Sequence, residues 1–421
     1  MRTNRSLLLV PLLLLFAPSA AQAVDVLKLE DGTRFAFSGY AQPYFRVVEN
    51  PCQQTITPGV AGTGGAPDVP GSVQCLRSTI PDGFGLQQVR LVFEGEHPGR
   101  GRLNLEIATA PNVELTEMEL GFDVAAHTVL RVGRMKVPYS RGGLVSESRS
   151  QFVVRTDQSS LATGRQLGVA LKQSLDVADI KEFASFEVGA FNGDKEAERS
   201  TINNIDEEFL YTARLVFQPT GKLNKLYEGD LRPIEQQDRL HAALGLGATT
   251  EKNTAEDYDQ IRAGADLNLL YGGASLLAES LYLERRFDGD VDTDYSGLGW
   301  AVAAGTFGPG EWASRHLELA VRYEWFDPKA ALDSDKASDV RAQAPGSGFA
   351  RPDGTQARAV TTVGANLYFA GHDFKLQMDY IHRQELENWE KSVRDPNDPL
   401  TPPAARQVDD DAFVAQLTYR L

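Results

Sequence analysis

The chain ends in the stretch DAFVAQLTYRL, which runs from Asp411 to Leu421. Every second residue of this stretch is apolar, from Phe413 up to the last residue. Such alternation predicts a β-strand with one apolar and one polar face. A strand that continues to the carboxyl terminus fits a closed sheet, because the last strand can pair with the first and leave no edge. The stretch therefore favours a closed β-barrel.

The same alternation recurs along most of the chain and outlines sixteen strands. Each has about the 9–11 residues that a tilted strand needs to cross a bilayer, and an even number is typical of bacterial outer-membrane barrels. We therefore predict an all-β fold, a transmembrane antiparallel β-barrel. The strands are expected near residues 35–46, 86–96, 101–109, 114–123, 127–137, 165–173, 183–192, 208–218, 238–250, 259–270, 273–286, 297–306, 315–326, 358–369, 373–385 and 411–421.

The predicted connections differ in length between the two ends of the barrel. If the amino terminus lies on the periplasmic side, long connections such as 138–164 face outward and short turns such as Tyr271-Gly272 face inward. The exception is 219–237, a long and polar connection on the inward side. A soluble sandwich or propeller would show the same period of two. The loop asymmetry and the export signal favour the membrane barrel.

The amino terminus has the pattern of that export signal. Residues 1–23 contain a basic start, a short apolar run and the small-x-small site Ala21-Gln22-Ala23. The apolar run is interrupted by Pro11 and is shorter than the ~20 residues that span a bilayer. We expect residues 1–23 to be a cleaved signal peptide and residues 24–421 to form a barrel in the outer membrane of a Gram-negative cell.

Composition argues against several classes of function. The 421 residues include 42 Lys and Arg against 58 Asp and Glu, which gives a net charge of −16. Nucleic acid is not an expected partner, because affinity for its backbone depends on clustered Lys and Arg. No cofactor or metal is expected either. The acidic run Asp288, Asp290, Asp292 and Asp294 lacks the Gly and the bidentate Glu of a calcium loop, so it is interpreted as a solvated tip.

The two cysteines, Cys52 and Cys75, lie in the predicted first outer loop and form no C-x-x-C pair. An oxidising compartment favours a disulfide between them. The alternative is two unpaired thiols in that loop. The prediction is a disulfide.

Two stretches carry a resemblance to a known family. Arg131 to Arg155 reads RVGRMKVPYSRGGLVSESRSQFVVR, and Val363 to Arg383 reads VGANLYFAGHDFKLQMDYIHR. Both resemble the phosphate-selective porins of outer membranes, the first through a G-x-x-K-x-P strand that leads into a Ser-rich loop. The resemblance implies a sixteen-stranded, homotrimeric, anion-selective porin whose third outer loop, here 138–164, folds into the lumen. One departure is the last residue, which is Leu421 where the family usually has Phe.

The charged groups at the narrowest point should decide which ions pass a porin. Between Pro138 and Arg165, four arginines accompany two carboxylates, an excess of two positive charges. We expect an electropositive constriction that favours phosphate or other small anions. The alternative is that these arginines pair with Glu147, Asp157 and wall carboxylates as a structural brace. The candidate constriction and anion-binding residues are Arg131, Arg134, Lys136, Arg141, Arg149, Arg155 and Arg165.

The predicted function is passive diffusion of small solutes and ions through a water-filled porin in outer-membrane lipid. An outer-membrane hydrolase and a plugged structural or adhesin barrel are the alternatives. The chain has no G-x-S-x-G and no H-E-x-x-H motif, so an enzyme is not expected.

Overall fold

The computed structural model describes residues 24–49, 52–56, 73–77, 83–110, 113–193, 208–222, 228–232, 234–254, 258–287, 295–327, 357–386 and 410–420. These residues form one closed antiparallel barrel of sixteen strands. Its strands are β2 (Arg34–Glu49), β5 (Gly83–His97), β6 (Gly101–Ala110), β7 (Glu114–Ala125), β8 (Thr128–Lys136), β9 (Arg165–Val177), β10 (Ile180–Phe191), β11 (Leu210–Phe217), β12 (His241–Asn253), β13 (Tyr258–Tyr271), β14 (Ala274–Phe287), β15 (Tyr295–Phe307), β16 (Leu317–Asp327), β17 (Arg358–Ala370), β18 (Phe374–Glu385) and β19 (Asp410–Arg420).

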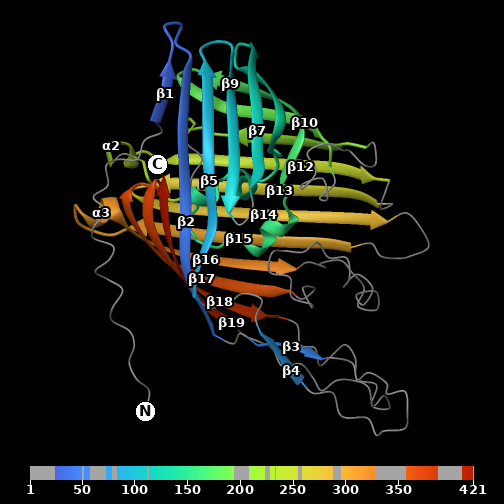
Figure 1. The fold of residues 1–421 in the computed structure, drawn as a ribbon, viewed down its shortest axis with the longest axis vertical. Helices are drawn as coiled ribbons and strands as arrows, with labels where there is room; N and C mark the ends of the chain where they lie inside the picture. Colours follow the sequence, from blue (N-terminus) through green and yellow to red (C-terminus); the bar gives the residue numbers. More distant parts are fainter. Residues whose placement is uncertain are drawn as a thin grey trace.

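Each predicted strand overlaps one of these strands, and every predicted bound lies within four residues of the observed one. The barrel closes where β19 pairs with β2, from Asp411 opposite Glu49 to Arg420 opposite Tyr40. The prediction of a closed sixteen-stranded barrel is therefore confirmed. In Figure 1, strands β2, β5, β7 and β9 run steeply across the direction of β12 to β16, as strand tilt in a closed barrel requires.

Three short strands were not predicted. β1 (Val24–Lys28) folds back on the first residues of β2, with Lys28 opposite Arg34. β3 (Cys52–Ile56) and β4 (Val73–Arg77) pair with each other in a separate ladder, within a region expected to be a loop. The cysteine side chains lie outside the described part of the chain, so the disulfide stays a prediction. The acidic run from Asp288 to Asp294 also lies outside it.

Alternate side chains of each strand face opposite sides of the barrel wall. In β19, Phe413 and Tyr419 are 40% and 38% exposed on the outer face, whereas Gln416 and Thr418 are buried on the inner face. Gln42 of β2 donates to both inner side chains, at 3.1 Å and 3.0 Å. The apolar face therefore points outward, as lipid requires, and the polar face lines the interior.

Among the described helices, none is long and apolar enough to cross a membrane. The barrel has one end of short turns, exemplified by Gly272 and Gly273 between β13 and β14. Both glycines have positive φ, as a tight hairpin turn requires. We call this the short-turn end. The helices are α1 (Arg141–Leu144), η2 (Glu147–Arg149), η3 (Asp157–Leu161), α2 (Ile234–Gln237) and α3 (Ala313–His316).

The largest buried apolar cluster lies inside the barrel. Its members come from both the wall and the connection between β8 and β9, which contains α1, η2 and η3. We call this connection, residues 137–164, the inner segment. The cluster comprises Met135, Val137, Tyr139, Leu161, Ala170, Phe191, Leu210, Leu281, Leu283 and Phe326.

Candidate functional site

The inner segment begins and ends at one point of the wall, where Val137 N donates to the Gly164 carbonyl at 3.3 Å. From there it passes along the inner face of β12 to β18. Tyr139 is fully buried, and its hydroxyl donates to the Ala263 carbonyl of β13 at 2.8 Å. Phe152 is buried against Ala303 and Ala320 of β15 and β16. The segment thus contacts the far wall and does not project beyond the barrel.

Glycines of the wall make room for this path. A Cβ added at Gly299 of β15 would lie 2.5 Å from Gln158 Cβ, and one at Gly247 of β12 would overlap the Tyr139 carbonyl oxygen. In van der Waals contact these atoms would be about 3.5–4.0 Å apart. The inner segment can lie so close to the wall only because these positions have no side chain.

The wall also binds the backbone of the inner segment through charged and amide side chains. Three N–H groups donate to three wall carboxylates: Gly142 to Glu279 at 2.9 Å, Val153 to Asp379 at 2.7 Å and Asp157 to Glu324 at 2.7 Å. Carbonyl groups accept from wall donors: Ser150 from Lys375 at 2.6 Å, Gln151 from Asn366 at 2.9 Å and Val154 from Arg322 at 2.8 Å. Hydrogen bonds to charged groups are among the strong ones. These wall groups hold the inner segment in place, and all of them except Glu279 are buried beneath it.

Two of the seven predicted basic residues are paired within the strands. Arg131 forms ion pairs with Glu119 at 2.6 Å and with Glu187. Arg134 pairs with Glu114 at 3.2 Å and donates to the Thr116 carbonyl. The charges of Arg131 and Arg134 are therefore balanced by carboxylates of nearby strands.

Lys136, Arg155 and Arg165 meet around the first turn of the inner segment. Lys136 donates to the carbonyls of Leu144 and Val145 at 2.9 Å and 3.3 Å. Arg155 forms an ion pair with Glu147 at 3.2 Å and donates to two carbonyls of the segment. Arg165 forms an ion pair with Glu117 at 2.7 Å and with Glu106 at 3.4 Å. The structure therefore brings these three predicted residues into one cluster.

A further cation of this cluster, Arg90 of β5, was not among the candidates. It forms an ion pair with Glu106. Burial alone would raise the pKa of Glu147, but Arg155 and Arg90 hold that pKa below its ordinary value. Strand alternation placed Arg90 on the polar face, yet no local motif marks it as a neighbour of the inner segment.

The remaining two candidates differ in their surroundings. Arg141 is buried in α1 and interacts electrostatically with Asp266, Glu228 and Glu279. Arg149, at the end of η2, is partly exposed and has no carboxylate of the described residues within the 4.0 Å ion-pair distance. The charged groups that act on Arg149 at longer range are Arg420, Asp373 and Glu94.

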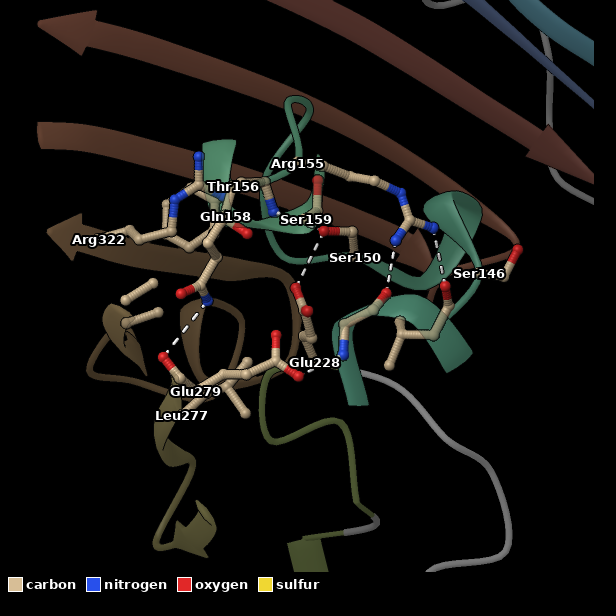
Figure 2. Close-up of a pocket in the computed structure, with 15 residues that line it drawn as sticks. Ser146, Ser150, Arg155, Thr156, Gln158, Ser159, Glu228, Leu277, Glu279 and Arg322 are labelled. Carbon is tan, nitrogen blue, oxygen red and sulfur yellow. Dashed lines mark hydrogen bonds between the residues drawn. The ribbon is translucent and has the colours of Figure 1, made fainter. Parts of the chain in front are cut away.

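A small cavity lies between part of the inner segment and β14, β15 and β16 (Figure 2). Its volume is about 50 Å³. Ser150 and Arg155 line it from the inner segment, and Glu279 and Arg322 from the wall. Figure 2 also shows Glu228, from the connection between β11 and β12, bonded to Ser150.

Comparison with known proteins agrees with the barrel fold. The family model described as phosphate-selective porin O and P matches residues 79–420. A search among curated protein sequences finds no match.

Solved structures of outer-membrane proteins have the same fold. The channel DcaP of Acinetobacter baumannii is 11% identical with a TM-score of 0.53, covering 94% of this chain and 100% of its own. The trimer form of OmpT from Vibrio cholerae is 11% identical with a TM-score of 0.52, covering 93% and 100%. The anion-selective porin of Comamonas acidovorans is 12% identical with a TM-score of 0.50, covering 92% and 100%. We conclude that this chain belongs to the phosphate-selective porin O and P family and forms an outer-membrane channel for passive diffusion.

Proposed function

We propose that the channel favours small anions, phosphate among them, over cations of the same size, and that the preference is modest. The observation that carries the proposal is Arg149, a cation of the inner segment that lacks an ion-pair partner among the described residues. Its guanidinium is influenced by Tyr40, Glu94 and Arg420, which belong to β2, β5 and β19. Solutes would therefore pass between the inner segment and this side of the wall.

The other charges on this side nearly cancel. With Arg149 included, six cations face five carboxylates, which leaves an excess of one positive charge. The cations are Arg90, Lys136, Arg149, Arg155, Arg165 and Arg420, and the carboxylates are Glu94, Glu106, Glu117, Glu147 and Asp373. Exposed charges beyond about 8 Å are largely screened at physiological salt. The few groups at this passage therefore matter more than the net charge of the chain.

The assay is the reversal potential in a planar bilayer under a potassium chloride gradient, for wild type and Arg149→Glu. At about 8 Å in water one unit charge changes an ion's energy by about 0.5 kcal/mol. Replacing a positive by a negative charge should lower the anion-to-cation permeability ratio about thirtyfold without screening and about fourfold at 0.15 M salt. Arg315→Glu, on exposed α3, is the matched control and should leave the ratio unchanged. An unchanged ratio in Arg149→Glu would remove the proposal.

Assembly and export belong to the same proposal. We infer a homotrimer, supported by the fold shared with OmpT, of which a trimer form is known. We also infer cleavage after Ala23, supported by the leader pattern of residues 1–23, which lie outside the described part of the chain. Cross-linking in detergent and intact mass of the purified protein test these two inferences.

A further inference from the structure

The connection between β11 and β12 is long, although it lies at the end of the barrel where the other example of a connection is a short turn. Its described residues, 218–222, 228–232 and 234–240, are fixed to neighbouring turns of the barrel. Buried Asp230 forms an ion pair with Arg232 at 2.7 Å and accepts from Gly273 N, in the turn after β13, at 3.2 Å. The Gln237 carbonyl accepts from Gly272 N at 2.7 Å. The connection is thus anchored on the rim of the barrel.

From this anchor, Glu228 reaches the middle of the inner segment. Its Oε2 accepts from Ser150 Oγ and from Gln151 N, both at 2.9 Å. Its backbone N donates to the Arg149 carbonyl at 3.1 Å. Its carbonyl oxygen lies 3.1 Å from Nε2 of His372, in the turn after β17. One residue therefore links the short-turn end to the stretch of the inner segment between η2 and η3.

We propose that Glu228 is a positioning residue of the pore, which fixes the inner segment from the short-turn end and so sets the width and steadiness of the passage. Lys375, Gln377 and Asn366 of the wall bind the carbonyls of Ser150 and Gln151. Glu228 supplies the complementary acceptor for the N–H of Gln151. This role rests on the channel function and not on the anion preference.

The physical expectation follows from the loss of a charged acceptor. Without the carboxylate, the Ser150 hydroxyl and the Gln151 N–H lose their partner, and the inner segment gains alternative positions. Because hydrogen bonds to a charged group are strong, the population of displaced segments should rise about tenfold or more. Each displacement changes the open cross-section beside Arg149. The change should appear as excess noise in the open-channel current.

The experiment is a double-mutant cycle on the full chain in planar bilayers, with wild type, Glu228→Ala, Ser150→Ala and the double variant. Open-channel noise, mean conductance and the largest neutral polyethylene glycol that lowers the conductance are measured. We expect Glu228→Ala to increase the noise severalfold and to change the size limit. We expect the double variant to have little more noise than Glu228→Ala alone, because both residues act through one contact. Glu311→Ala, exposed in the connection between β15 and β16, is the control.

A conservative variant separates positioning from barrel stability. Glu228→Gln keeps a carbonyl oxygen and should restore most of the wild-type noise and size limit. Wild-type noise and size limit in Glu228→Ala would overturn the proposal, and so would a lowered melting temperature with an unchanged current. If Glu228→Ala does not fold, Ser150→Ala decides: increased open-channel noise supports the proposal, and wild-type noise and size limit overturn it. The reversal potential of the Arg149 variant tests the anion preference separately.

Discussion

The close approach of the inner segment to the wall can be tested by adding one methyl group. Gly299→Ala places a Cβ 2.5 Å from Gln158 Cβ and 3.3 Å from its Cα. Gln158 is 1% exposed in η3, and its amide donates to the Glu279 carbonyl at 3.3 Å. To restore an ordinary contact of about 3.5 Å, the segment must move about 1 Å away from β15. That movement breaks the bond to Glu279.

Overpacking of this kind costs about 1–3 kcal/mol. Because the displacement is directed away from the wall, the passage on the other side of the segment should become narrower. We expect Gly299→Ala to lower the melting temperature of the purified barrel and its single-channel conductance. The measurements are thermal unfolding in detergent and conductance in a planar bilayer.

The matched control is Gly95→Ala in β5, where the three atoms nearest to an added Cβ are side-chain atoms of Phe35 and Leu103, at 3.2–3.4 Å. It should change neither quantity appreciably. If Gly299→Ala has the conductance and the melting temperature of wild type, the close packing of the inner segment against the wall does not depend on the missing side chains of the wall glycines.

Three other predictions concern charge, lipid contact and the cysteines. Burial would raise the pKa of Asp157, but Arg358 and Arg383 hold that pKa below its ordinary value. The ionised carboxylate therefore stabilises the barrel above about pH 4, and this stabilisation is lost as the pH falls through the lowered pKa. The melting temperature of Asp157→Asn should fall less between pH 7 and pH 3 than that of wild type, and an equal fall would contradict this prediction. Leu246→Arg, on the exposed outer face of β12, should destabilise the barrel by about 2–4 kcal/mol if it lies near the bilayer midplane; refolding titrations into lipid vesicles would show a smaller loss if that face does not meet lipid. Alkylation with and without reductant should add mass at Cys52 and Cys75 only after reduction, and reduction should lower stability by about 3 kcal/mol in the chain-entropy model; labelling without reductant would mean free thiols.

Much of the fold could be predicted because the decisive signal is local. A lipid-facing strand must alternate apolar and polar side chains, so each strand carries its own evidence, as the stretch around Phe413 and Tyr419 does. Strands β1, β3 and β4 escaped prediction because each has only 5 residues and does not follow a bilayer-length pattern. The alternation of apolar and polar residues therefore predicted the long strands and missed the short ones.

The candidate site was predictable only in part. The sequence placed Lys136, Arg149, Arg155 and Arg165 in or beside a segment of positive charge. Whether one of these cations forms an ion pair depends on carboxylates of other strands, such as Glu106 and Glu117. The charge balance of the passage therefore could not be read from the segment alone.

By itself the sequence determined the barrel, its inner and outer faces and the segment that carries the candidate cations, because these features follow from residue order within a few residues. Only the tertiary structure decided which charged groups hold the segment and which partners the candidate cations have. Val153 meets Asp379 across 226 residues of sequence, and Ser150 meets Glu228 across 78. Such pairs depend on the closure and register of the whole sheet, which bring together inward-facing groups that no local pattern connects.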